Sequence, residues 1–264
     1  MRLKDKRVFI TGAGGAIGRA TALKCAAEGA AVIAADIDAA AVEATLAALR
    51  QAGAPAAAVT GDLSVSAACA GMFDEGAAAF GGIDALFNNA GVCLPGDDGP
   101  VETPEEVWHR TLAANLTSVF LACKHGLPHL LRARRGVIVN NASIVALVGS
   151  AYPQIAYTAA KGGVLAMTRE LAVMYARRGL RSVAICPGPV ATPLVQSFLA
   201  EPGAWEKRRP YLPMGRLGQP EEIANLVAFL ASDEASYING SAYPIDGGLT
   251  AAYVIDDAQT PVEF

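Results

Sequence analysis

The stretch Val8-Phe-Ile-Thr-Gly-Ala-Gly-Gly-Ala-Ile-Gly18 decides the fold of this 264-residue chain. An apolar run ends in a glycine-rich turn, and a helical pattern follows from Arg19 to Glu28. Such a turn needs glycine because a side chain would keep a pyrophosphate away from the backbone at the N-terminus of the helix. The spacing differs from the common GxGxxG, since position 17 is Ile, and the turn taken alone could be merely structural.

Short runs rich in Val, Ile and Ala recur along the chain and are separated by longer amphipathic segments, which predicts a parallel sheet with crossover helices. The runs mostly lack strict alternation of polar and apolar residues, so helices should cover both faces of the sheet. The expected fold is therefore α/β, a three-layer doubly wound parallel sheet of the Rossmann type with about seven strands. The strands are expected near residues 7–11, 31–36, 56–61, 83–88, 136–141, 181–186 and 242–245.

Length and composition limit the protein to a few classes. A chain of 264 residues with 53% hydrophobic content suits one domain spanning 1–264. The formal charge of -4 offers no basic field for nucleic acid or anionic lipid. No uncharged apolar run approaches the ~20 residues that span a bilayer. We therefore expect no nucleic-acid partner and no membrane association.

Cysteine and histidine usage argues against disulfides and metals. The five cysteines are odd in number and widely scattered, as expected of free thiols in the reducing cytoplasm. His125 and His129 are four residues apart, a spacing that could hold a metal, but Pro128 intervenes and no third ligand is apparent. We predict a cytoplasmic protein without a metal site.

The second expected strand ends in an acidic residue that bears on the cofactor. Asp36 follows Gly18 by 18 residues, where a carboxylate can accept both adenosine ribose hydroxyls and would repel a 2′-phosphate. This favours NAD over NADP, although Asp36 could instead be a solvated helix cap. Asp62, at the end of the third strand, could bind adenine or cap the helix expected near Ser64.

Tyr157 and Lys161 are four residues apart in a segment with helical periodicity, so they share one face of a helix. A tyrosine with a pKa of ~10 is a poor base, but a neighbouring ammonium and a positive nicotinamide would stabilise its phenolate. An exposed pair on a solvated helix is the alternative that the two residues alone leave open. The strand over 136–141 delivers Ser143 close to the expected start of this helix.

Taken together, these residues and their order resemble the short-chain dehydrogenase/reductase family over roughly residues 5–249. The resemblance rests on six ordered motifs: Thr11-Gly12 through Gly18, Asn88-Asn89-Ala90-Gly91, Asn115, Ser143, Tyr157-x-x-x-Lys161, and Pro187-Gly188-Pro189-Val190-x-Thr192. The sequence departs from the family at Ala16, which replaces the usual second glycine, and in a Ser143–Tyr157 gap one residue longer than the commonest spacing. Neither departure removes a functional group.

The resemblance implies a role for each catalytic residue. Ser143 would hold the substrate oxygen, Tyr157 would give or take its proton, and Lys161 would lower the Tyr157 pKa and bind the nicotinamide ribose. Asn115 would hold a water that relays protons. The implied cofactor-binding residues are Gly12, Gly15, Ala16, Ile17, Gly18, Asp36, Ile37, Asp62, Leu63, Asn89, Ala90, Gly91, Tyr157, Lys161, Pro187, Gly188, Val190 and Thr192.

Residues 189–213 interrupt the strand–helix alternation with five prolines, which predicts a lid over the substrate. The substrate-lining residues expected there and nearby are Cys93, Val145, Gln154, Phe198 and Trp205. The tail over 250–264 is apolar enough to dock on a neighbouring subunit. Long helices near 104–130 and 155–178 carry apolar residues on more than one face, and the family resemblance makes a homotetramer the expected assembly.

The expected function is NAD(H)-linked interconversion of a secondary alcohol and a ketone, on an apolar or cyclic substrate, with Tyr157 as the general acid/base. One alternative is a 3-oxoacyl-carrier-protein reductase, which usually draws on NADPH and is therefore opposed by Asp36. Another is a non-catalytic dinucleotide-binding sensor, which would have no need for the four catalytic residues.

Overall fold

A computed structural model describes residues 1–133, 135–150, 152–200 and 202–252 of the chain. In them, seven parallel strands form one sheet in the order β3-β2-β1-β4-β5-β6-β7. The strands are β1 Arg7–Thr11, β2 Ala31–Asp36, β3 Ala56–Thr60, β4 Ala85–Asn88, β5 Gly136–Asn141, β6 Leu180–Pro187 and β7 Ala242–Ile245. The doubly wound α/β fold predicted from the sequence is confirmed, and the predicted strand bounds differ by at most two residues.

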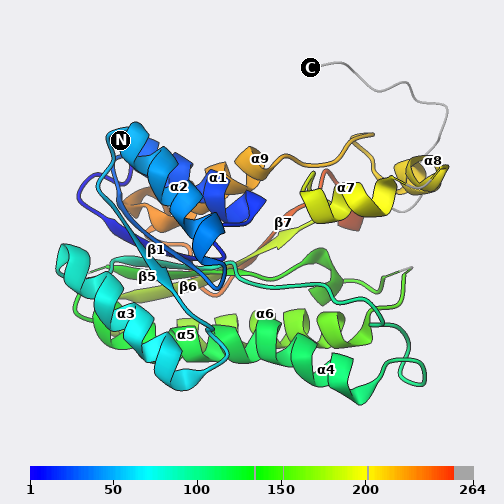
Figure 1. Ribbon diagram of the computed structural model, residues 1–264, viewed down its shortest axis with the longest axis horizontal. Coiled ribbons are helices and arrows are strands. Elements are labelled where there is room, and N and C mark those ends of the chain that lie inside the picture. Colours follow the sequence, from blue (N-terminus) through cyan, green and yellow to red (C-terminus); the bar gives the residue numbers. More distant parts are fainter. Residues whose placement is uncertain (134, 151, 201, 253–264) are drawn as a thin grey trace.

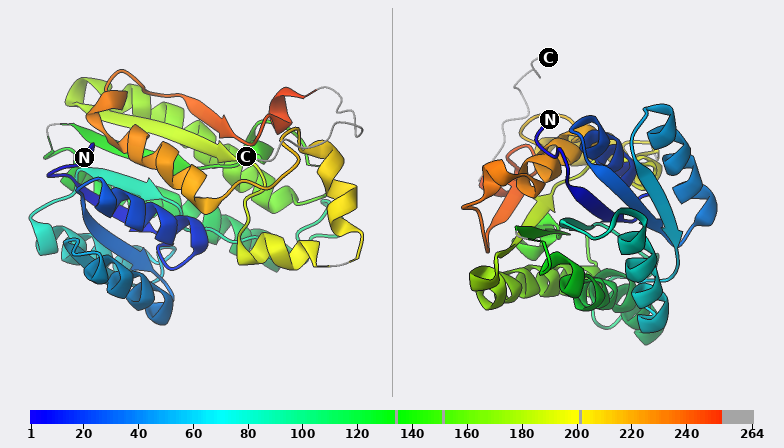
Figure 2. Two further views of the ribbon diagram at one scale, coloured as in Figure 1. Left: turned by 90° about the horizontal axis from the view of Figure 1, so that it is seen from above. Right: turned by 90° about the vertical axis from the view of Figure 1, so that its left-hand side faces the viewer.

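Helices cover both faces of this sheet (Figures 1 and 2). Their bounds are α1 Ala16–Ala27, α2 Ala39–Gln51, α3 Ser66–Phe80, α4 Glu105–Leu112, α5 Ser118–Leu130, α6 Ile155–Tyr175, α7 Pro193–Leu199, α8 Ala204–Arg208 and α9 Pro220–Ala231. A π-helical turn, Ala113–Thr117, joins α4 to α5. Within the described ranges, no helix is both long and apolar enough to cross a bilayer.

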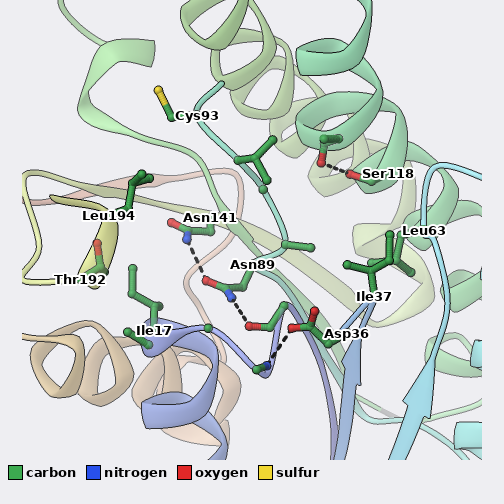
Figure 3. A pocket seen from close by; sticks show the side chains of 18 of the residues that line it. Ile17, Asp36, Ile37, Leu63, Asn89, Cys93, Ser118, Asn141, Thr192 and Leu194 are labelled. Carbon is green, nitrogen blue, oxygen red and sulfur yellow. Dashed lines mark hydrogen bonds between the residues drawn. The ribbon is translucent and has the colours of Figure 1, made fainter. Parts of the chain in front are cut away.

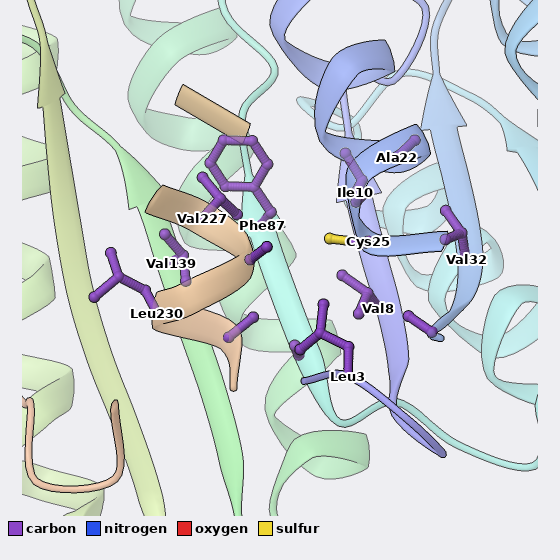
Figure 4. Packing of buried hydrophobic residues seen from close by; sticks show 14 of the residues in the cluster. Leu3, Val8, Ile10, Ala22, Cys25, Val32, Phe87, Val139, Val227 and Leu230 are labelled. Atoms are coloured by element: carbon purple, nitrogen blue, oxygen red, sulfur yellow. The ribbon is translucent and has the colours of Figure 1, made fainter. Parts of the chain in front are cut away.

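Two apolar cores separate the sheet from its helical layers. In the first, buried residues such as Val8, Phe87 and Val139 meet Cys25 of α1 and Val227 of α9 (Figure 4). In the second, β-strand residues pack against α3, α5 and α6, and the Phe9 and Phe73 rings stack with centroids 4.2 Å apart. Because both faces of the central strands are buried, these strands are mostly apolar, as the sequence indicated.

The strand order predicts a binding cleft at the carboxyl ends of the central strands. β1 lies between β2 and β4, so the connections that leave β1 and β3 run to opposite sides of the molecule. Ligands of doubly wound sheets bind beyond the carboxyl ends of the strands at this point of reversal. The tail expected to dock on a neighbour, 250–264, lies outside the described residues from 253 onward.

Candidate active site

A cleft of about 900 Å³ opens at the carboxyl ends of the strands (Figure 3). It brings together most of the residues that the sequence selected. Those that line it are Gly12, Gly15, Ala16, Ile17, Asp36, Ile37, Asp62, Leu63, Asn89, Ala90, Gly91, Ser143, Tyr157, Lys161, Pro187, Gly188, Val190 and Thr192.

The glycine-rich turn brings the first turn of α1 to the cleft. Gly12 has φ +63°, and a Cβ there would lie 2.9 Å from the Ala90 backbone. Gly15, the N-cap residue of α1, has no side chain to accept the first amides of the helix, and no acidic residue lies in the first turn. Uncapped amides at a helix N-terminus are suited to an anion such as pyrophosphate.

Gly18 was predicted to bind the cofactor, but it does not line the cleft. A Cβ on Gly18 would collide with the Gly12 carbonyl oxygen. This glycine therefore permits the close approach of α1 to the turn, and its effect on the ligand is indirect.

The carboxylate of Asp36 is anchored at the edge of the cleft. Its Oδ2 accepts a hydrogen bond from the Gly14 amide at 2.8 Å, and its Oδ1 accepts one from the Asp38 amide at 3.1 Å. Asp38, and not Asp36, caps α2 by accepting from the amides of Ala40 and Ala41. The alternative reading of Asp36 as a helix cap is therefore wrong.

Asp62 likewise does not cap a helix. Its Oδ1 accepts from the amide and the hydroxyl of Ser64, at 2.8 and 2.7 Å. Helix α3 begins later, at Ser66, with Val65 as its N-cap residue. Asp62 thus shapes the loop that forms this end of the cleft.

Side-chain amides join the strand ends beneath the cleft. Asn89 Nδ2 donates to the carbonyl oxygens of Thr11 and Gly12, and Asn141 Nδ2 donates to Asn89 Oδ1 at 3.0 Å (Figure 3). The Thr11 hydroxyl accepts from the Asn89 and Ala90 amides. The sequence analysis did not select Asn141. The signal that could have identified it is its position as a polar residue at the end of the buried strand β5.

Ser143, Tyr157 and Lys161 converge at the inner part of the cleft. The Ser143 hydroxyl lies near the Tyr157 phenol and acts to lower the pKa of Tyr157. The Lys161 Nζ lies 5.5 Å from the centre of the Tyr157 ring and donates to the Asn141 carbonyl oxygen at 2.8 Å. Helix α6 supplies both Tyr157 and Lys161 from one face, as their spacing predicted.

Burial dominates the ionisation of these groups. It raises the pKa of Tyr157 to about 12, with the Cys93 thiol adding to the rise and the Ser143 hydroxyl opposing it. Burial also lowers the pKa of Lys161 to about 8, because the charged ammonium is desolvated. Burial thus outweighs the groups that would stabilise the phenolate, and the pKa of Tyr157 is raised in the protein alone, whereas Lys161 was expected to lower it.

Asn115 is fully buried and does not line the cleft. It lies in the π-helical turn, where Oδ1 accepts from the Val92 amide and Nδ2 donates to the Val92 and Thr111 carbonyl oxygens. Its visible role is to fasten the turn to the loop after β4. π-helical turns of this kind often mark functional sites.

Of the five expected substrate-lining residues, only Cys93 lines the cleft. The Val145 amide, in the turn Ile144–Ala146, donates to Ser143 Oγ, and Gln154 Nε2 donates to the Ser150 hydroxyl. Phe198 is 56% exposed on α7, and Trp205 lies one helix further on. Phe198 and Trp205 belong to the segment 189–213, and the fold of that segment, not its composition, decides which of its side chains line the cleft.

The lid reaches the cleft through the first turn of α7. Residues missed by sequence reasoning also line the cleft: Gly14, Asp38, Ala41, Gly61, Ser64, Val92, Arg110, Ala113, Ala114, Ser118, Asn141, Ala142, Pro193, Leu194 and Val195. Thr192, the N-cap residue of α7, accepts from the Val195 amide and so fixes this turn at the cleft. A threonine followed by a proline was the available signal for that cap.

Comparison with known proteins agrees with this geometry. A family model described as enoyl-(acyl carrier protein) reductase matches residues 12–250. 3beta-Hydroxysteroid dehydrogenase 1 of Eggerthella lenta is 39% identical over 253 residues, covering 94% of this chain and 95% of its own. Cis-4-hydroxycyclohexanecarboxylate dehydrogenase of Sinomonas cyclohexanicum is 42% identical over 248 residues, covering 94% and 97%.

A solved structure of an Agrobacterium tumefaciens protein with bound NADP superposes with a TM-score of 0.86. It is 32% identical and covers 95% of this chain and 98% of its own. The described fold is thus one that accommodates a nicotinamide dinucleotide.

Proposed function

This chain is an oxidoreductase of the short-chain dehydrogenase/reductase family, and we propose that it interconverts a secondary alcohol and a ketone with NAD(H). The observation that carries the proposal is the meeting of Ser143, Tyr157 and Lys161 in one cleft with the uncapped N-terminus of α1. Bound nicotinamide supplies or accepts the hydride.

The protein's own residues handle the substrate oxygen and its proton. The Ser143 hydroxyl orients the oxygen by hydrogen bonding. Tyr157 donates its phenol proton to the oxygen during ketone reduction and is left as a phenolate, and this phenolate accepts the alcohol proton during oxidation. A phenol with a raised pKa is ready to act as the acid. Lys161, buried 5.5 Å from the ring, favours negative charge on the phenol oxygen when it carries its proton.

We propose that the dinucleotide is NAD. The residues that would hold it are Gly12 and Gly15–Ile17 at the pyrophosphate, Asp36 and Asp62 at the adenosine, and Pro187–Thr192 at the nicotinamide. Asp36 and Asp38 both line the adenosine end, so a 2′-phosphate would meet two carboxylates.

We propose a neutral, apolar substrate with the hydroxyl or carbonyl on a ring. Figure 3 shows Cys93 and Leu194 away from Asp36, and their neighbours in the sequence Val92, Pro193 and Val195 also line the cleft. None of these five carries a charge. The names of the two relatives also describe hydroxyl groups on ring systems.

The five cysteines lie unpaired, four of them buried, which supports a reducing compartment such as the cytoplasm. We also propose a homotetramer built through α5 and α6. A groove between these helices is lined by Phe120, Leu127, Met167, Leu171 and Tyr175 among others, and Phe120 is 51% exposed. A second copy would cover this apolar surface.

The test is a screen of alicyclic alcohols and ketones that follows NADH absorbance, with the Tyr157→Phe variant beside the natural protein. We expect turnover with NAD(H) and a loss of about 10²- to 10⁴-fold in Tyr157→Phe, because the variant lacks the acid/base group. NADH affinity, measured by calorimetry, should change little. A Tyr157→Phe variant as active as the natural protein would refute the assignment of the acid/base. A natural protein that binds NADH but turns over no substrate would instead support the non-catalytic sensor.

The description of the family model names the acyl carrier protein, which is also the carrier in the 3-oxoacyl-carrier-protein reductase alternative. It predicts turnover of acyl thioesters with NADPH. A thioester arm in the same screen separates the two functions, and a strong NADPH preference would defeat the NAD proposal.

A further inference from the structure

The first turn of α6, which carries Tyr157, has no cap of its own. The helix begins at Ile155, and the side chain of its N-cap residue, Gln154, makes no cap bond and donates instead to Ser150. The first amides of a helix have no intrahelical acceptor and need one from elsewhere. In α6 these amides belong to the catalytic tyrosine and its neighbours.

Their acceptors come from a loop about 60 residues earlier in the chain. Asp97 Oδ1 accepts from the Ala156 amide at 2.9 Å, and Asp97 Oδ2 accepts from the Tyr157 amide at 2.8 Å. The Asp98 carbonyl oxygen accepts from the Ile155 amide at 3.1 Å. One carboxylate thus holds two adjacent amides, and its charge is favoured by the positive end of the helix.

The same loop forms one side of the cleft. It leaves β4 through Asn89–Gly91, and Cys93 faces the cleft four residues before Asp97. Burial is the main cause that raises the pKa of the Cys93 thiol, and the Asp97 charge adds to it. The two groups are therefore near each other. Asp97 therefore joins the loop that lines the cleft to the backbone of the residue that moves the proton.

We propose that Asp97 is a positioning residue for catalysis. It contacts none of the reacting atoms, and it fixes the position of the Tyr157 hydroxyl relative to Ser143 and Lys161 by holding the Tyr157 amide. The inference rests on the proposed acid/base role of Tyr157.

The test compares Asp97→Ala, Asp97→Asn and the control Asp98→Ala. Among the described residues, the Asp98 side chain accepts only from the Gly99 amide. The bond of Asp98 to α6 is made by its backbone carbonyl, which the control variant keeps. We expect Asp97→Ala to lower kcat by about 10- to 100-fold, because small misplacements of a reacting group are costly. Asp97→Asn keeps one acceptor oxygen and should recover part of this loss, and Asp98→Ala should stay within about twofold of the natural protein.

Two further readouts separate positioning from general damage. NADH affinity by calorimetry should be unchanged in Asp97→Ala, while amide hydrogen exchange of a peptide covering 155–160 should accelerate. In a double-mutant cycle, Asp97→Ala should cause no further loss in a Tyr157→Phe background, because its effect acts through the Tyr157 hydroxyl.

Equal losses from Asp97→Ala with and without the Tyr157 hydroxyl would overturn the proposal. So would an unchanged kcat in Asp97→Ala. If Asp97→Ala does not fold, Asp97→Asn carries the same cycle. An active Tyr157→Phe protein would instead refute the proposed function itself, whatever the Asp97 variants do.

Discussion

At the scale of single residues, the site contains a buried ammonium group, that of Lys161, whose charged form is destabilised by desolvation. Lys161 is 3% exposed, its Nζ has one protein hydrogen bond in the described residues, to Asn141, and burial lowers its pKa from 10.5 to about 8. Below pH 8 the buried lysine is charged, so folding carries the full desolvation cost. Between pH 8 and 10.5 the unfolded chain binds more protons than the folded one, and stability rises with pH.

Lys161→Met should therefore stabilise the protein while abolishing its turnover. At pH 7 we expect a gain of roughly 2 kcal/mol, the cost of the buried charge less the lost hydrogen bond to Asn141. The gain should shrink as the pH rises from 8 to 10.5, because the natural lysine becomes neutral in that window. Urea unfolding at several pH values measures it. A destabilised variant at pH 7 would show that the ammonium contributes to folding.

Asp36 gives the residue-scale prediction on the cofactor. Asp36→Ala removes the carboxylate at the adenosine end, so the ratio of kcat/KM for NAD to that for NADP should fall by about 10- to 100-fold. Asp38 lines the same end of the cleft and remains in the variant, so some preference for NAD should persist. An unchanged ratio would remove Asp36 from the selection of the cofactor.

At the scale of secondary-structure elements, the parts predicted from sequence are those with strong local signals. The apolar strands and the Gly12–Gly18 turn were placed within two residues because burial on both faces and close backbone approach restrict the residue types. The segment 104–130 was predicted as one long helix, but the π-helical turn around Asn115 divides it. One extra residue in a turn hardly changes the hydrophobic periodicity, so the pattern could not reveal the division.

The segment 189–213 also shows what local sequence patterns do not predict. The prolines predict that 189–213 interrupt the alternation of strands and helices, but they do not predict how much of α7 lines the cleft. Leu194 lines the cleft whereas Phe198, one turn later on the same short helix, is 56% exposed. Which side chains face the substrate depends on how 189–213 pack on the rest of the molecule, and those contacts are remote in sequence.

At the scale of the whole molecule, the remaining question is what covers the outer face of α5 and α6, which lie side by side below the sheet in Figure 1. For the natural protein, we predict a mass near four times 27.1 kDa by light scattering. The Phe120→Arg variant should dissociate, because a guanidinium buried between two copies would have no partner of opposite charge. Val65→Arg is the matched control, since Val65 is also 51% exposed but lies beside α3. If Phe120→Arg kept the natural mass, or if both variants dissociated equally, α5 and α6 would not be the interface. Retained NADH affinity in the dissociated variant would show that each copy holds a complete cleft.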